Sequence, residues 1–305
     1  MQTRTTLVRR TSFLGCAAAA LVAAASTSVY AQPPSPPVGA ERPARGEAEL
    51  NDLAEKVQNP VAKMVSVPLQ NNTSFDIGPY HRASNVLNVQ PILPLALTRD
   101  WNLINRVILP IGYAPDINSL TEGASGVGDL QWTGLVSPND MGELKWGVGP
   151  ILQFPTATQT VLGTGHWTLG PSAVVAWQRR PWSVGALASN QWSYAGESGR
   201  SAVNLLTVQP FVNFNMAEGW FLTSSPIITA NWKATSGDIW TFPIGGGVGK
   251  IFKIASQAMN AQVQAFWNAA TPNTNGAGWQ ARLQIGFLFP EKQQLTSQPI
   301  AASTR

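Results

Sequence analysis

Residues 84–113 read SNVLNVQPILPLALTRDWNLINRVILPIGY, a stretch that predicts two β-strands joined by a short polar turn. In the first half, leucine and valine occupy one parity, and Asn88 and Gln90 occupy the other. In the second half, the apolar parity begins at Trp101, and the opposite parity carries Arg106. Successive side chains of a strand point to opposite faces. Each predicted strand therefore has one apolar face and one largely polar face.

The same pattern recurs to residue 289 and predicts twelve strands. Short connections alternate with long ones, and the predicted long connections include residues 70–83 and 155–166. Short turns at one end and longer loops at the other are typical of transmembrane barrels. We therefore predict an all-β fold, an antiparallel up-and-down transmembrane barrel of about 12 strands with a short N-terminal helix. The strands are expected near residues 61–69, 84–98, 101–113, 127–136, 144–154, 167–178, 182–194, 203–215, 220–232, 239–254, 259–268 and 279–289.

The charge content also favours a membrane barrel. Only 12% of the residues are charged, against about 25% in soluble globular proteins. The basic isoelectric point depends on arginines near the N-terminus: without Arg4, Arg9 and Arg10 the chain has 17 basic and 16 acidic residues. A nearly neutral chain without a basic stripe does not indicate a nucleic-acid partner.

The N-terminal region predicts export. Residues 1–31 combine three arginines, an apolar core and small residues, which is the pattern of a cleaved signal peptide. The single cysteine, Cys16, would leave with this segment, so we expect neither a disulfide nor a cysteine metal site in the mature chain. Residues 32–46 are rich in proline and predict an extended linker.

Residues 47–60 predict a short amphipathic helix, because Leu50, Leu53 and Val57 recur at helical spacing. Two roles remain open for it: a helix that leads into the barrel from the periplasm, or a plug inside the barrel. Residues 61–290 are expected to form the barrel, and residues 291–305 a disordered C-terminal tail.

Tryptophans stand near the ends of the predicted strands. Amphipathic rings at both membrane interfaces form aromatic belts in such barrels. The alternative, a soluble β-sandwich core, would place them in the middle of strands. The predicted belt residues are Trp101, Trp146, Trp167, Trp182, Trp220, Trp240 and Trp279.

The polar parity of the strands predicts the lining of a lumen. Arg106 and Arg282 are its most informative members, since rings of charge set the selectivity of pores. Equally, these arginines could pair with interior acids or amides and stiffen the wall. The predicted lumen-lining residues are Arg106, Asp129, Gln131, Lys145, Gln153, Gln209, Gln264, Arg282 and Gln284.

Catalytic and metal sites are poorly supported. His81 and Ser84 are close in sequence, but no oxyanion-hole pattern accompanies them. The acids Asp116, Glu122 and Asp129 do not have the spacing of a calcium-binding loop. We therefore expect no catalytic residue, no metal and no cofactor.

Several short stretches resemble one family of bacterial outer-membrane proteins, which is mislabelled "neuromedin U" in sequence collections. The resemblance covers roughly residues 53–290 and implies a transporter-type barrel, loosely akin to channels for aromatic and other hydrophobic compounds, without signature catalytic residues. The chain departs from this pattern by continuing beyond Phe289. The matching stretches include LAEKVQNPVA at 53–62, SVPLQNN at 66–72, GVGD at 126–129, WGVGP at 146–150, PWSVGAL at 181–187 and FLFP at 287–290.

The sequence thus predicts a barrel in the bacterial outer membrane that passes or binds a small solute by passive diffusion. Its expected partners are outer-membrane lipid, the solute and the barrel-assembly machinery. One alternative is a non-conducting structural or adhesion barrel whose long extracellular loops carry the function. Another is a barrel hydrolase that depends on His81.

Overall fold

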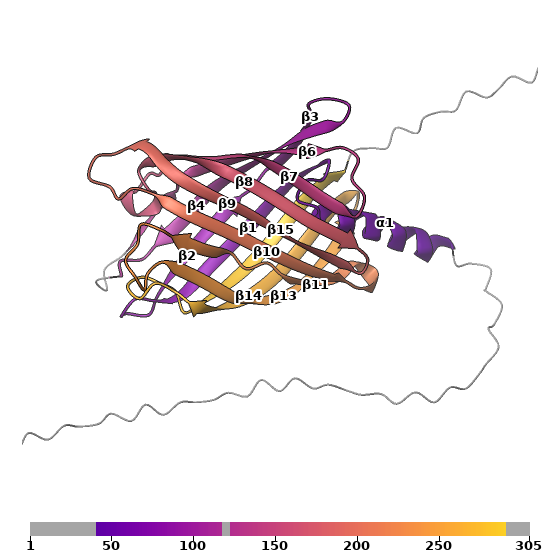
Figure 1. Ribbon diagram of the computed structural model, residues 1–305. Helices are drawn as coiled ribbons and strands as arrows, with labels where there is room; N and C mark the ends of the chain where they lie inside the picture. Colours follow the sequence, from indigo (N-terminus) through magenta and orange to yellow (C-terminus); the bar gives the residue numbers. More distant parts are fainter. Residues whose placement is uncertain (1–40, 118–122, 291–305) are drawn as a thin grey trace, which may run out of the picture. The chain divides into compact units, whose positions relative to one another are not determined.

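The computed structural model describes residues 41–117 and 123–290. The predicted signal peptide, the C-terminal tail and most of the predicted linker lie outside this part of the chain. The described residues form a closed antiparallel β-barrel of 12 strands with one N-terminal helix (Figure 1). The elements are α1 (Glu41–Gln58), β1 (Met64–Ile77), β2 (Arg82–Val89), β3 (Ile92–Ala96), β4 (Trp101–Ala114), β5 (Ala124–Val127), β6 (Leu130–Pro138), β7 (Leu144–Phe154), η1 (Thr160–Leu162), β8 (His166–Arg179), β9 (Trp182–Gly196), β10 (Asn204–Asn215), η2 (Ala217–Gly219), β11 (Trp220–Ser224), β12 (Ile228–Asn231), β13 (Trp240–Ile254), β14 (Gln257–Ala270) and β15 (Trp279–Pro290).

Three of the barrel strands are interrupted, so 15 strand segments make 12 barrel strands. The pairs β2 and β3, β5 and β6, and β11 and β12 each form one wall strand. Pro91 and Pro226 lie at two of the interruptions. Proline has no backbone N–H to donate to the sheet, which explains why the ladder breaks there.

The barrel closes where β1 pairs with β15, from Met64 opposite Pro290 to Phe75 opposite Trp279. Full closure leaves no unpaired sheet edge, as a spanning structure requires in hydrocarbon. Strand β8 has 14 residues, more than the roughly 9–11 that a tilted strand needs to cross a bilayer. The predicted up-and-down barrel is confirmed.

Short connections gather at one end of the barrel, which we call the short-turn end, and the other end is the long-connection end. One predicted long loop, residues 70–83, is wrong: β1 continues to Ile77, and only a tight turn separates it from β2. The polar residues that indicated a loop instead bridge the two strands. The Asn71 amide donates to Asn85 Oδ1 at 3.0 Å, and the Asn85 amide donates to Thr73 Oγ1 at 2.8 Å.

Helix α1 begins at Glu41, so the predicted linker, residues 32–46, is wrong for residues 41–46. Pro43 falls in the first helical turn. A proline is tolerated there because the first N–H groups of a helix have no partner within it. No helix within the described ranges is long and apolar enough to cross a membrane.

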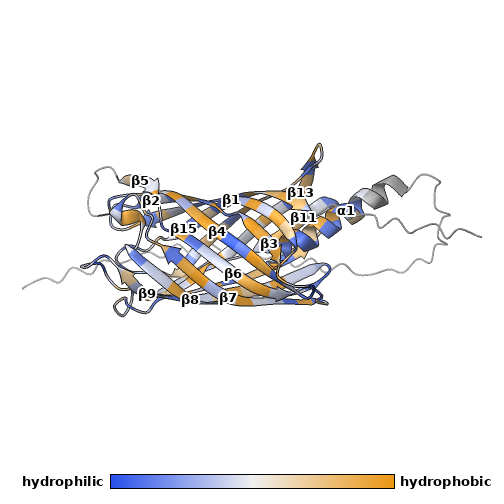
Figure 2. Cartoon of the chain, turned by 90° about the horizontal axis from the view of Figure 1, so that it is seen from above, coloured by the Kyte–Doolittle hydropathy of each residue, from blue (hydrophilic) through white to orange (hydrophobic). Residues whose placement is uncertain are grey.

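Strand β8 shows most clearly how the two faces of the wall differ. Its residues alternate without exception between buried and exposed, and the buried set is mainly polar or small. Figure 2 shows the same change between apolar and polar bands along the strands around the barrel. The apolar side chains face outward and the polar ones face the lumen. The buried residues of β8 are His166, Thr168, Gly170, Ser172, Val174, Ala176 and Gln178.

Candidate functional site: the barrel lumen

A cavity of about 210 Å³ lies inside the barrel, and we call it the lumen cavity. Its lining has a polar part and an apolar part. Val57, Gln58 and Pro60, at the end of α1 and just after it, also line it. The polar part includes Gln70, Gln90, Arg106, Gln209, Gln262 and Gln284, and the apolar part includes Ile92, Ile104, Leu135, Leu187, Phe211 and Phe221.

A row of polar side chains crosses neighbouring strands between the two lumen arginines. Arg106 Nη2 on β4 donates to Gln90 Oε1 at 2.5 Å. Arg282 Nε on β15 donates to Asn72 Oδ1 at 2.9 Å, and the Gln70 amide donates to the same oxygen at 3.1 Å. The row thus runs from β15 through β1 and the break between β2 and β3, where Gln90 lies, to β4; these wall strands are successive neighbours in the sheet.

Arg282 is held in place by neutral groups. Its Nη1 donates to the Ser225 carbonyl oxygen at 2.7 Å, and the Ser225 N–H donates to Gln264 Oε1 at 3.0 Å. The guanidinium lies over the ring of Phe266, 5.1 Å from the ring centroid. Only 3% of Arg282 is exposed. These contacts fix the Arg282 side chain in the wall and use most of its N–H donors. Its positive charge therefore acts on the lumen without the guanidinium entering it.

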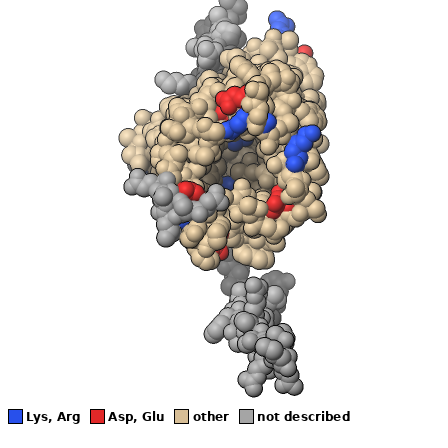
Figure 3. Space-filling view, turned by 90° about the vertical axis from the view of Figure 1, so that its left-hand side faces the viewer, with Lys and Arg blue, Asp and Glu red and all other residues tan. Residues whose placement is uncertain are grey.

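Neither lumen arginine has an acidic partner in the described part of the chain. Among the described residues, the ion pairs involve Lys56, His81, Arg179 and Lys253, and neither Arg106 nor Arg282. In the view into the long-connection end, Figure 3 shows a hollow with Lys and Arg atoms on its wall and deeper inside it. The part of the lumen around the cavity therefore carries positive charge.

The predicted lumen residues fall into three groups. Arg106, Gln209 and Gln284 line the lumen cavity. Gln264 and Arg282 are buried beside it through their contacts with Ser225. The other four, Asp129, Gln131, Lys145 and Gln153, lie elsewhere on the inner wall and do not line the cavity.

Asp129 belongs to the long-connection end, where it holds the segment between β7 and β8. Its Oδ2 accepts from the Thr164 N–H at 2.6 Å and from Gln153 Nε2 at 3.0 Å. Its Oδ1 accepts from the Ala157 N–H at 3.2 Å. Gln131 is paired opposite Gln153 on the adjacent strand. Since the carboxylate is occupied by protein donors, Asp129 fixes this connection in place.

Lys145 lies at the short-turn end. Its Nζ donates to the carbonyl oxygen of Met141, in the connection between β6 and β7, at 2.8 Å. Sequence reasoning missed Gln70, Asn72 and the contribution of α1 to the cavity. The signal for Gln70 and Asn72 was their parity with the inward-facing residues of β1, which the predicted loop concealed.

The C-terminal half of α1 docks into the short-turn end. Leu53 and Ala54 are buried against inward-facing residues of the barrel, among them Phe221 and Ile251. Gln58 exchanges two amide hydrogen bonds with Asn215, at 2.8 and 3.0 Å. Of the two roles left open for this helix, these contacts support the plug.

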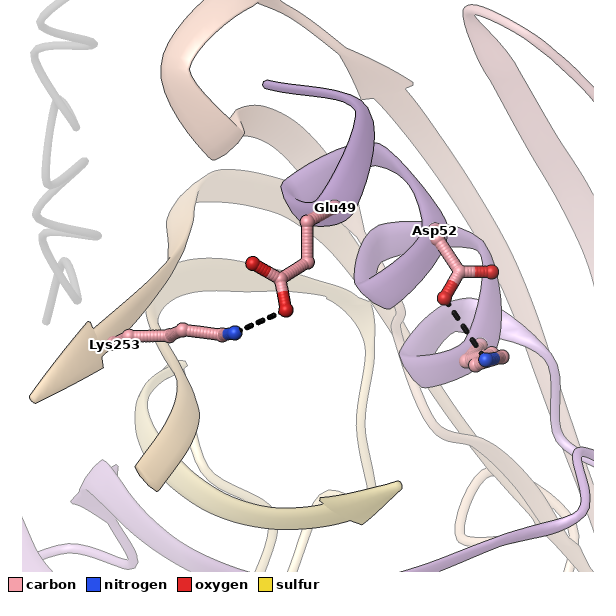
Figure 4. A network of polar contacts seen from close by, with 4 residues as sticks. Glu49, Asp52 and Lys253 are labelled. Atoms are coloured by element: carbon pink, nitrogen blue, oxygen red, sulfur yellow. Dashed lines mark hydrogen bonds and ion pairs between the residues drawn. The ribbon is translucent and has the colours of Figure 1, made fainter. Parts of the chain in front are cut away.

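Polar contacts add to this docking on both sides of the helix. Glu49 pairs with Lys253 of β13, whereas Asp52 is paired within the helix (Figure 4). The Gln178 amide of β8 donates to the Glu55 carbonyl oxygen at 3.1 Å. Two strands that are not neighbours in the sheet, β8 and β13, thus hold the same helix, which obstructs the lumen at this end.

The tryptophans lie on the outer face. All seven predicted belt residues are exposed, and each stands within the first three residues of its strand. Lys250, also at the short-turn end, has its Nζ 4.6 Å from the ring centroid of Trp220. Four further exposed tryptophans were not predicted as belt residues: Trp177, Trp192, Trp232 and Trp267.

The candidate catalytic residues are not assembled. His81 Nδ1 contacts Asp76 Oδ1 at the exposed turn between β1 and β2, and no hydrogen bond joins it to Ser84. Within the described ranges, no group of three or more His, Cys, Asp or Glu side chains is arranged to hold a metal ion.

Comparisons with known proteins identify the fold. No protein-family model matches the chain, and neither does any curated protein sequence. Among solved structures, an outer-membrane channel from Pseudomonas putida F1 is 19% identical, with a TM-score of 0.59 over 75% of this chain and 96% of that one. The NanC porin is 10% identical, with a TM-score of 0.46 over 74% of this chain and 99% of that one.

A Pseudomonas aeruginosa FadL homologue is 8% identical, with a TM-score of 0.38 over 76% of this chain and 92% of that one. The similarity to the Pseudomonas putida protein shows a shared fold. The chain therefore has the fold of a bacterial outer-membrane β-barrel.

Proposed function

We propose that this chain is an outer-membrane channel that passes or binds small solutes by passive diffusion. The observation that carries the proposal is the lumen cavity, which lies behind a closed wall with an apolar outer face and a polar inner face. An apolar outer face suits contact with lipid, and a polar lumen suits a water-filled path. The resemblance to the transporter-like "neuromedin U" family supports the same function.

The proposed orientation places the short-turn end and α1 in the periplasm and the long connections outside the cell. Export would rely on residues 1–31 as a cleaved signal peptide, and insertion on the barrel-assembly machinery. The outward-facing tryptophans at both strand ends would then lie at the two interfaces of the outer membrane.

The helix favours a channel that is closed at rest. Its docked half obstructs the short-turn end through apolar contacts, two amide hydrogen bonds and one ion pair. Conduction then requires the helix to shift, or leaves only a narrow path beside it. A permanently docked helix would instead suit the alternative, a non-conducting barrel that acts through its long connections.

The test is single-channel recording in planar bilayers. We expect discrete conductance steps from the refolded mature chain in potassium chloride. Heated and unheated gel samples provide the folding control, since folded barrels usually migrate differently. A barrel that is folded by this measure but shows no steps at any voltage would contradict the channel and favour the non-conducting alternative.

The lipid-facing role of the tryptophans has its own test. All 12 tryptophans lie within the described ranges, and 11 of them are exposed on the outer face. We expect lipids brominated near the headgroup to quench the fluorescence more strongly than lipids brominated near the chain ends. Quenching that does not depend on the depth of the bromine would contradict the two belts.

A further inference from the structure

The lumen cavity contains a cationic group whose hydrogen-bonding capacity is only partly used. A guanidinium has five N–H donors. Among the residues that the structure describes, Arg106 makes one hydrogen bond, to Gln90, and its buried Nε has no partner. Because Arg106 lines the cavity and uses only one of its donors on a protein group, its guanidinium indicates a position for an acceptor in the cavity.

The charge around this position is not balanced. Arg106 and Arg282 carry like charges and repel each other, and neither forms an ion pair with a described carboxylate. Burying a charge without a counter-charge is costly. Arg282 is compensated by Asn72 and Ser225, which are neutral acceptors. Arg106 faces the cavity, so an anion there would compensate both charges.

The apolar part of the lining restricts what the anion can be. Ile104, Leu135, Phe211 and Phe221 line the same cavity as Arg106. The cavity volume of about 210 Å³ lies below the roughly 300–1,000 Å³ of pockets for drug-sized ligands, so the space suits a compact molecule. Inorganic phosphate would leave this apolar surface unused, whereas a ring or short chain bearing one carboxylate would use both parts.

We propose that the lumen cavity binds small monocarboxylates with an apolar body, and that Arg106 receives the carboxylate. Arg282 contributes charge through its fixed position in the wall and does not contact the solute. Gln90 orients Arg106 by accepting its Nη2 hydrogen bond. This inference rests on the proposed function as a channel and names the class of solute.

The test compares the mature chain with Arg106→Gln, using benzoate as the probe. Arg106→Gln removes the charge but keeps a polar side chain. Hydrogen bonds to charged groups contribute more than neutral ones, so we expect benzoate affinity to fall by about tenfold or more, as measured by calorimetry on the detergent-solubilised barrel. In bilayers, we expect benzoate to block the chloride current through the mature chain. We also expect the Arg106→Gln variant to prefer chloride over potassium less strongly than the mature chain does.

Lys250→Gln is the matched control. It removes one positive charge from the outer face beside Trp220, and benzoate binding should be unchanged. Arg106→Lys, which keeps the charge without the planar fork, should retain the chloride preference and bind benzoate more weakly than the mature chain.

The outcomes separate the two proposals. Absence of conductance steps together with Arg106-dependent benzoate binding would remove the channel and keep the binding site. Conductance steps from a chain that does not bind benzoate would overturn the binding site and keep the channel. Conductance steps together with equal benzoate affinity in the mature chain and in Arg106→Gln would have the same meaning. Equal affinity for benzamide would show that charge is not recognised, and equal affinity for inorganic phosphate would show that the apolar lining is not used; either result overturns the proposal.

Discussion

Replacing Leu53 with alanine should raise the open probability of the channel by about thirtyfold or until it saturates. Leu53 is 3% exposed and lies in the apolar cluster that joins α1 to the short-turn end. A buried leucine-to-alanine change costs about 2–5 kcal/mol, and 2 kcal/mol corresponds to a factor of about 30 in the equilibrium between docked and released helix. Single-channel recording at constant voltage measures the open fraction directly.

Glu55→Ala provides the comparison on the same helix. The Glu55 side chain is exposed, and its contact with Gln178 uses the backbone carbonyl, which alanine retains. We expect this variant to behave like the unaltered chain. If Leu53→Ala and Glu55→Ala have equal open probabilities, α1 does not limit conduction.

The second large effect is expected at Asp129. Alanine at this position would leave the partly buried N–H groups of Ala157 and Thr164 without their acceptor. An unsatisfied buried group costs about 1–3 kcal/mol, and we expect the two partly buried groups together to cost about as much as one, so the connection between β7 and β8 should open locally about tenfold more often. Thermolysin cleavage within residues 155–165 of the folded barrel measures this opening.

Asp140→Ala tests whether loss of any carboxylate has the same effect. Asp140 is exposed in a short connection at the other end of the barrel. Cleavage within residues 155–165 should stay at its original rate in this variant. Asp129→Ala with an unchanged cleavage rate would mean that the carboxylate does not hold the connection.

The strands were predictable because their periodicity reflects contact with two different environments. Leu95 and Leu97 point outward and Asn102 points inward, as their parity predicts, because lipid and lumen impose opposite preferences on one strand. The strand count and the closed barrel followed from repeating this reasoning along the chain.

The errors arose where local composition did not reflect long-range pairing. Residues 70–77 are polar enough to resemble a loop, yet Asn71 and Thr73 bond to Asn85 across the β1–β2 hairpin, and Asn72 bonds to Arg282 on the strand that closes the barrel. The start of α1 was missed because Pro43 suggests a linker, although a first helical turn accepts it. Whether Arg106 and Arg282 had acidic partners could not be decided from alternation, because parity gives the face of a residue but not its neighbours.

Arg282 also has a consequence for biogenesis. Its Nε acceptor, Asn72, comes from β1 near the start of the barrel, so this hydrogen bond forms only when the last strand meets the first. Until that seam forms, the guanidinium lacks its Nε acceptor, and a charged group with an unsatisfied donor disfavours contact with hydrocarbon. We therefore expect a partly assembled sheet to be poorly suited to the bilayer and the completed ring to be the form that inserts.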